Sequence, residues 1–142
     1  MMDNDRLIAE KRVLASKLPV SSYKFMDMDT DNPFLVMAAK TNKGNVYTIR
    51  IDLAHFPLRK PEAFVRKMLY TKGGSPMSGP SSAMHTLTSK YGFTQICHYA
   101  DSAWTEWVSL YKVYIKCRLW LEMYDLHLET GKNMDYYLNH QH

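Results

Sequence analysis

The stretch Tyr47-Thr48-Ile49-Arg50-Ile51-Asp52-Leu53 alternates apolar and polar side chains more regularly than any other part of the sequence. Successive side chains of a β-strand point to opposite faces, so a period of two is typical of a strand with one buried and one solvated face. Strands of this kind occur mostly in antiparallel sheets. The stretch therefore predicts an antiparallel sheet in this part of the chain.

The segments on either side support that prediction. Short apolar runs alternate with turn-forming sequences, of which Asn42-Lys43-Gly44-Asn45 has the composition of a hairpin turn. The predicted strands are Tyr23–Met28, Phe34–Lys40, Tyr47–Leu53 and Ala63–Tyr70, with Pro57 and Pro61 interrupting the chain before the last of them. These segments predict a four-stranded antiparallel meander.

Helical patterns flank the strands. Within residues 3–18 apolar residues recur at helical spacing, and Pro19 ends the run; these residues are Leu7, Ile8, Leu14 and Leu18. A second pattern begins at Thr105, a candidate N-cap, and ends at Thr130-Gly131. Its stripe consists of Trp107, Leu110, Tyr111, Tyr114, Cys117, Leu121, Tyr124 and Leu128. The stripe predicts one or two amphipathic helices, with these aromatic rings in the core rather than in a stacking surface.

Two stretches between the last strand and the second helix show no periodicity. Residues 71–83 are rich in Gly, Ser and Pro, and we expect them to form a flexible loop that does not pack into a core. A second irregular stretch carries His85, Tyr91-Gly92-Phe93 and Cys97. Long irregular segments inside a domain of this size are often functional.

The length is that of one domain, residues 1–142, and the helical and strand patterns together predict the α+β class. Hydrophobic residues make up 46% and charged residues 23% of the chain, which is enough apolar surface for a core without disulfides. No apolar run approaches a membrane span, and the N-terminus lacks the apolar stretch of a signal peptide, so we expect a cytoplasmic protein. The net charge of +4 comes from scattered basic residues, which favours a solvated surface over a nucleic-acid partner.

The two cysteines stand in different contexts. Cys117 belongs to the helical stripe, which predicts an inert core thiol. Cys97, in Gln95-Ile96-Cys97-His98-Tyr99, lies at the end of a loop where a large substrate could reach it. A thiolate at such a position can act as a nucleophile, although many cysteines in loops are inert.

Other candidate groups lie near Cys97 in the sequence. Adjacent side chains of an extended segment point apart, so His98 is expected to face away from the thiol and Tyr99 to share its side. His85 could approach the thiol through folding, either as a base or as a structural histidine. Neither these residues nor His55 have the spacing of a metal site, and the chain has no Gly-rich phosphate loop, so we expect no metal or cofactor.

The order of these features resembles the ubiquitin-conjugating enzyme fold: a helix, a four-stranded meander, a proline-interrupted exit, a long irregular segment, a cysteine in a loop, and then helices. Further motifs resemble a bacterial branch of that family, encoded beside cGAS-like nucleotidyltransferases in CBASS antiphage operons. They are Ile96-Cys97-His98-Tyr99, Trp104, Trp120-Leu121-Glu122-Met123-Tyr124-Asp125 and Glu129-Thr130-Gly131.

The resemblance implies thioester chemistry in antiviral defence. Cys97 would accept the activated C-terminus of the nucleotidyltransferase and pass it to an amine, such as a lysine of an acceptor protein. His85 takes roughly the place of the histidine in the family's His-Pro-Asn motif, and Asp101 is the candidate acidic residue beside an acceptor lysine. The chain departs from the pattern at Leu87, where eukaryotic members carry an asparagine that donates to the oxyanion.

Two alternatives remain open at this stage. The first is a non-catalytic adaptor of the same fold that binds the nucleotidyltransferase without using Cys97. The second is a nucleic-acid-binding module, which is the weaker hypothesis because the aromatic residues follow core periodicity and do not alternate with Lys and Arg.

Overall fold

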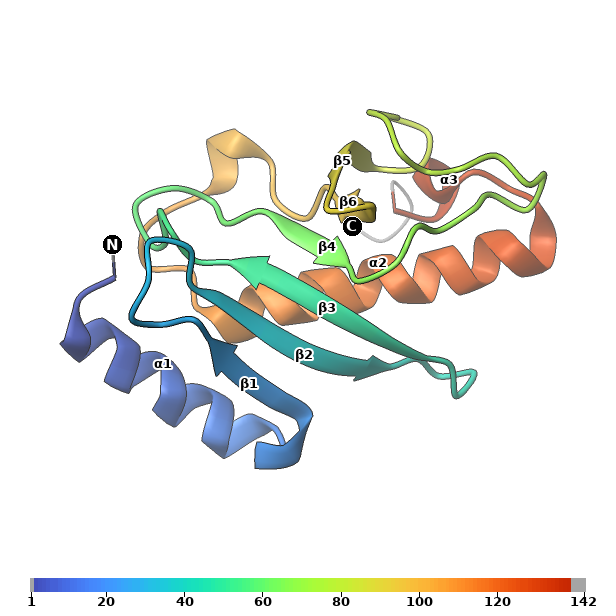
Figure 1. The fold of residues 1–142 in the computed structure, drawn as a ribbon. Helices are drawn as coiled ribbons and strands as arrows, with labels where there is room; N and C mark the ends of the chain where they lie inside the picture. Colours follow the sequence, from blue (N-terminus) through green and yellow to red (C-terminus); the bar gives the residue numbers. More distant parts are fainter. Residues whose placement is uncertain (1, 139–142) are drawn as a thin grey trace.

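Six antiparallel strands and three α-helices make up the part of the chain that the structure, a computed structural model, describes, namely residues 2–138 (Figure 1). In chain order the elements are α1 (Asn4–Lys17), β1 (Tyr23–Met26), β2 (Phe34–Lys40), β3 (Val46–Asp52), β4 (Ala63–Val65), β5 (Thr86–Lys90), β6 (Phe93–Ile96), α2 (Leu110–Thr130) and α3 (Met134–Leu138). Short 3₁₀ turns lie at Val20–Ser22 and Asp101–Ala103. The predicted α+β class with an antiparallel sheet is confirmed.

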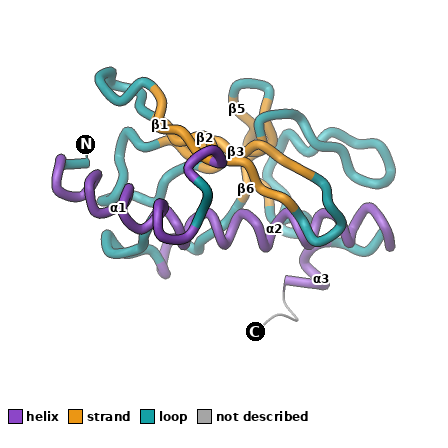
Figure 2. Tube along the Cα trace, turned by 90° about the horizontal axis from the view of Figure 1, so that it is seen from below, coloured by secondary structure: helices purple, strands orange, loops and turns teal. Residues whose placement is uncertain are grey.

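The sheet has the strand order β1-β2-β3-β4-β6-β5. The period of two in β3 is confirmed, because Tyr47, Ile49 and Ile51 are buried and Ile49 and Ile51 pair with Met37 and Leu35 of β2. These side chains face one core together with α1 and α2, which lie on the same side of the sheet (Figure 2). The opposite face of the sheet, called the outer face below, carries Arg50 and Phe64, which are paired across β3 and β4.

The predicted number of strands is wrong. The fourth strand ends at Val65 instead of Tyr70, and the stretch expected to be irregular contains β5 and β6. These two strands form a hairpin around Tyr91-Gly92, both of which have positive φ. Only Thr86 of β5 is buried, because this strand lies at the edge of the sheet. The strand has few apolar side chains, so the sequence shows no periodic pattern that would predict it.

The segment 71–83 also differs from its prediction. Met77 is 4% exposed and belongs to the core, so the expectation that this stretch cannot pack is wrong at that residue. Its backbone N–H donates to the carbonyl of Leu69, and the N–H of Thr71 donates to the carbonyl of Ser75. The segment therefore folds back on itself and inserts one long apolar side chain.

The first helix begins as predicted, with the side chain of Asp3 accepting a hydrogen bond from the backbone N–H of Arg6 (2.8 Å). Its predicted apolar face is partly wrong, because Ile8 is exposed while Glu10 is buried. One oxygen of the Glu10 carboxylate accepts from the backbone N–H of Leu110 (2.7 Å), and the other accepts from Nε of Arg6 (2.8 Å). Glu10 thereby joins α1 to the positively polarised N-terminus of α2.

The second helix begins later than predicted. Its N-cap is Ser109 rather than Thr105, and Trp107 lies before the helix and is 80% exposed. Leu128 is also exposed, contrary to the predicted stripe. The predicted end is confirmed, since Gly131 caps the helix in the left-handed conformation that favours glycine.

Replacing Glu10 with Ala should lower the free energy of unfolding by about 1.5–3 kcal/mol, the range for hydrogen bonds to charged groups. The loss arises because Leu110 N–H and Arg6 both lose a buried acceptor. Urea denaturation measures it. Arg12→Ala, at an exposed position of the same helix, is the control and should change stability by less than about 0.5 kcal/mol. Equal effects of the two substitutions would contradict this role of Glu10.

Candidate active site

Cys97 follows β6 directly and is held by the edge of the sheet. Its backbone N–H donates to the carbonyl of His85 (3.0 Å), which continues the pairing of β6 with β5. The residue is half-buried, and its Sγ makes no hydrogen bond with any residue of the described chain, 2–138. It lines a surface groove of ≈ 320 Å³, here called the Cys97 groove, together with Lys60, Leu87, Gln95, Tyr99 and Asp101 among others.

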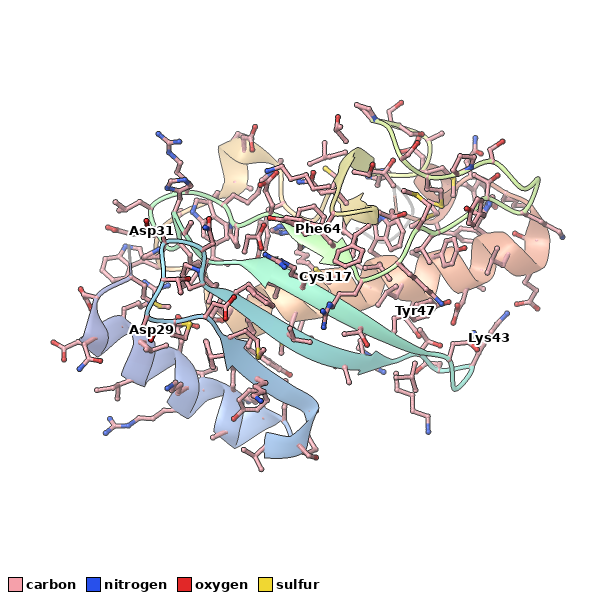
Figure 3. The ribbon with its side chains drawn as sticks, viewed as in Figure 1. Asp29, Asp31, Lys43, Tyr47, Phe64 and Cys117 are labelled. Carbon is pink, nitrogen blue, oxygen red and sulfur yellow. The ribbon has the colours of Figure 1, made fainter. Side chains whose placement is uncertain are left out.

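Cys117 has the opposite environment. It lies on α2 behind the sheet (Figure 3), it is fully buried, and burial raises the pKa of its thiol to about 12. At neutral pH this thiol is protonated and inaccessible. The prediction that Cys117 is an inert core residue is confirmed.

His85 reaches Cys97 through its backbone and not through its imidazole. The residue has a φ of 51°, and its carbonyl accepts from both Cys97 N–H and the indole Nε1–H of Trp120 (2.9 Å). Its imidazole Nε2 lies 2.8 Å from Oδ1 of Asp135, on α3. These contacts connect the backbone at Cys97, through His85, to α2 and α3.

His98 lines the Cys97 groove as well, and its ring is held by the loop before β4. Its Nε2 lies 2.8 Å from the carbonyl oxygen of Pro61, which can only accept, so Nε2 carries the hydrogen. Burial lowers the pKa of His98 to about 4, so the ring is neutral at pH 7. Its Nδ1 is buried and has no hydrogen-bond partner among residues 2–138. The basic nitrogen of His98 is therefore buried and makes no hydrogen bond to Cys97.

Asp101 lies at the rim of the Cys97 groove, with its side chain 94% exposed. Its carboxylate lies 2.9 Å from Nζ of Lys60, and this hydrogen bond holds the pKa of Asp101 below its usual value. The same ammonium donates to the carbonyl of Tyr99 (2.7 Å). Lys60 therefore connects the loop before β4 to the segment after Cys97.

The sequence prediction did not include Gln95, the polar side chain that accompanies Cys97 in the groove. Gln95 is 5% exposed, and its amide nitrogen donates to Oε2 of Glu62 (3.2 Å). The other oxygen of Glu62 accepts from Nζ of Lys90 (2.7 Å). Gln95 also lies directly across from Leu87, the position where the resemblance expects an asparagine. Its spacing of two residues from Cys97 in a strand would have identified it, because both side chains then share one face.

Residues 2–138 contain no cluster of three or more His, Cys, Asp or Glu side chains able to hold a metal ion. None of their helices is both long enough and apolar enough to cross a bilayer. Comparison of the chain with protein-family models, curated proteins and solved structures found no match.

The buried imidazole of His98 should make the protein less stable in acid. The unfolded chain binds a proton there below the ordinary pKa of 6.5, whereas the folded chain does so only below about 4. The folded state therefore binds fewer protons between these values, and its stability falls as pH falls through that interval, by about 3 kcal/mol at most.

Denaturation with urea at pH 7, 5.5 and 4 measures this loss. His98→Gln, which keeps a donor for the carbonyl of Pro61, should show a flatter dependence on pH. The control is His55→Gln, at an exposed position, which should keep the wild-type slope. An unchanged slope in His98→Gln would show that another group causes the loss.

Proposed function

We propose that this chain is a stand-alone bacterial ubiquitin-conjugating-like enzyme that acts in antiphage defence. In this proposal Cys97 forms a thioester with the C-terminus of a cGAS-like nucleotidyltransferase and transfers it to an amine. One observation carries the proposal. A half-buried thiol without a hydrogen-bond partner among residues 2–138 lies in a groove at the end of a strand, while the other thiol is sealed in the core.

The arrangement of the elements supports the family part of the proposal. A helix precedes an antiparallel sheet, the proline-containing segment 55–61 separates β3 from β4, and the cysteine follows the last strand and precedes α2. The β5–β6 hairpin adds two strands to the predicted meander without changing that order.

The chemistry requires an activated carboxyl terminus, supplied as a thioester by a separate activating enzyme. The Cys97 thiolate attacks the carbonyl carbon, its new C–S bond forms, and the donor thiolate leaves and takes up a proton. An amine then attacks the same carbon, loses its proton and releases the Cys97 thiolate. Both steps pass through an oxyanion that needs hydrogen-bond donors.

We assign the donation to that oxyanion to Gln95, which lines the groove together with Cys97. A primary amide has two N–H groups, and only one of those on Gln95 is used, in the bond to Glu62. Lys90 bonds to the other oxygen of Glu62 and so helps to hold the carboxylate that accepts from the amide. Gln95 thus compensates for the apolar Leu87 across the strand pair.

The adaptor remains the second candidate, and a specific observation favours it. Neither imidazole is hydrogen-bonded to the Cys97 thiol among residues 2–138, and the Nε2 atoms of His85 and His98 contact Asp135 and Pro61 instead. An adaptor would bind the nucleotidyltransferase tail in the Cys97 groove and form no covalent adduct.

Intact mass of the protein co-expressed with its cognate nucleotidyltransferase and activating enzyme should separate the two candidates. Wild type should carry a thiol-sensitive adduct, Cys97→Ser a thiol-resistant one, and Cys97→Ala none. Cys117→Ala should keep the adduct and lose about 1 kcal/mol of stability, as expected for a small buried deletion. Transfer by Cys97→Ala would exclude the catalytic role, and a non-covalent complex without an adduct in any variant would favour the adaptor.

Replacing Gln95 with Leu should slow transfer from the Cys97 thioester to an amine by about 100-fold, the lower end for the loss of an oxyanion donor. Adding Leu87→Asn to that variant returns an amide to the same cross-strand pair and should recover part of the rate. Single-turnover kinetics measure both effects. A wild-type rate in Gln95→Leu would show that the oxyanion is held by other groups.

A further inference from the structure

A second hollow adjoins the Cys97 groove on the outer face of the sheet. This hollow, here called the outer pocket, has a volume of ≈ 350 Å³. Its charged lining consists of Arg50, Arg59, Lys60 and Lys90 with Asp52 and Glu62, so positive charge is in excess. A concave surface with this balance attracts anions.

Arg50 is held in place before any ligand binds. Its guanidinium lies between the rings of Phe34 and Tyr91, with its central carbon 3.8 Å and 4.2 Å from their centroids. Its Nε bonds to Oδ1 of Asp52 (2.8 Å), and the hydroxyl of Tyr91 donates to the other oxygen of Asp52 (2.9 Å). The guanidinium is therefore rigid, which reduces the entropy lost on binding.

The two terminal nitrogens of the Arg50 guanidinium, Nη1 and Nη2, remain available as hydrogen-bond donors. Neither makes a hydrogen bond to any residue of the described chain, 2–138, although the side chain is only 15% exposed. Two parallel N–H groups match the two oxygens of a carboxylate. Arg59 is exposed and, within the same part of the chain, its side chain has no hydrogen bond or ion pair, so it can add a second contact.

The outer pocket and the Cys97 groove are neighbours that share part of their lining. Lys60, Pro61 and Glu62 line both of them, so this short segment is the ridge between the two hollows. An extended peptide whose carboxyl terminus lies at Cys97 can cross the ridge and place an earlier side chain in the outer pocket. A free anion would use the pocket but gain nothing from the neighbouring groove.

We propose that the outer pocket binds an acidic side chain of the peptide whose carboxyl terminus occupies the Cys97 groove. The preferred tail then carries Asp or Glu a few residues before its C-terminus. The inference specifies the substrate class of the proposed function and rests on it for its biological meaning. The binding itself requires no acyl transfer.

The test uses the full chain with Cys97→Ala, which cannot form a thioester, and two fluorescent peptides. One peptide carries Glu residues before its C-terminus, and the other carries Gln at the same positions. Fluorescence anisotropy should show the Glu peptide binding at least about tenfold more tightly, which is one charge-assisted contact. Equal affinity for the two peptides would overturn the proposal.

Variants of the pocket sharpen this test. Arg59→Gln and, separately, Arg50→Lys should each weaken binding of the Glu peptide several-fold and leave the Gln peptide unchanged. Arg12→Gln, which removes an exposed cation on α1, should change neither affinity. If Arg12→Gln weakened binding of the Glu peptide as much as Arg59→Gln does, the preference would follow from the net charge of the protein. That result would overturn the proposed site.

Inorganic phosphate distinguishes a peptide site from a small-anion site. Phosphate should displace the Glu peptide only at concentrations far above the dissociation constant of the peptide. Displacement at equal concentrations would overturn the peptide assignment. Because the assay uses Cys97→Ala, a missing adduct in the co-expression experiment and a missing peptide preference here are separate results.

Discussion

The backbone carbonyl of His85 links the core of this protein to its candidate nucleophile. The indole of Trp120, on the buried side of α2, and the backbone N–H of Cys97 both donate to this one oxygen. A positive φ at His85 turns the carbonyl toward them, and the contact of its imidazole with Asp135 holds the turn from α3. The backbone at Cys97 is therefore joined to α2 through this carbonyl.

A second set of polar contacts surrounds the same segment. Lys60 bonds to Tyr99 and Asp101 after the thiol, while Glu62 bonds to Gln95 before it. Residues 60–62 thus contact the chain both before and after Cys97. The same residues lie between the Cys97 groove and the outer pocket. The proposed transfer chemistry and the proposed tail recognition depend on the same ridge.

Periodic apolar burial is what made much of the fold predictable from sequence. β3 and the core positions of α2 follow regular spacing, so the sheet, the helix and the buried Cys117 could be inferred. The edge hairpin β5–β6 could not, because it is mostly polar and depends on pairing with β4. The sequence also did not predict that Glu10 is buried and Ile8 exposed, because the burial arises from a contact with the distant N-terminus of α2.

The candidate site was predictable only in part. The context of Cys97 distinguished it from Cys117, which is buried in the core. Partners supplied by distant segments were not visible: Asp135 for His85, Lys60 for Asp101 and Glu62 for Gln95. Each of these contacts joins residues more than thirty positions apart in the chain.

In the proposed mechanism Cys97, whose backbone is joined to the core, is the acyl acceptor. Transfer from a short synthetic peptide thioester to the purified protein, followed by intact mass and peptide mapping, tests this role without any cellular partner. We expect a single thioester at Cys97, cleaved by hydroxylamine, and none at Cys117. No adduct with any peptide thioester, or equal labelling of both cysteines, would contradict it.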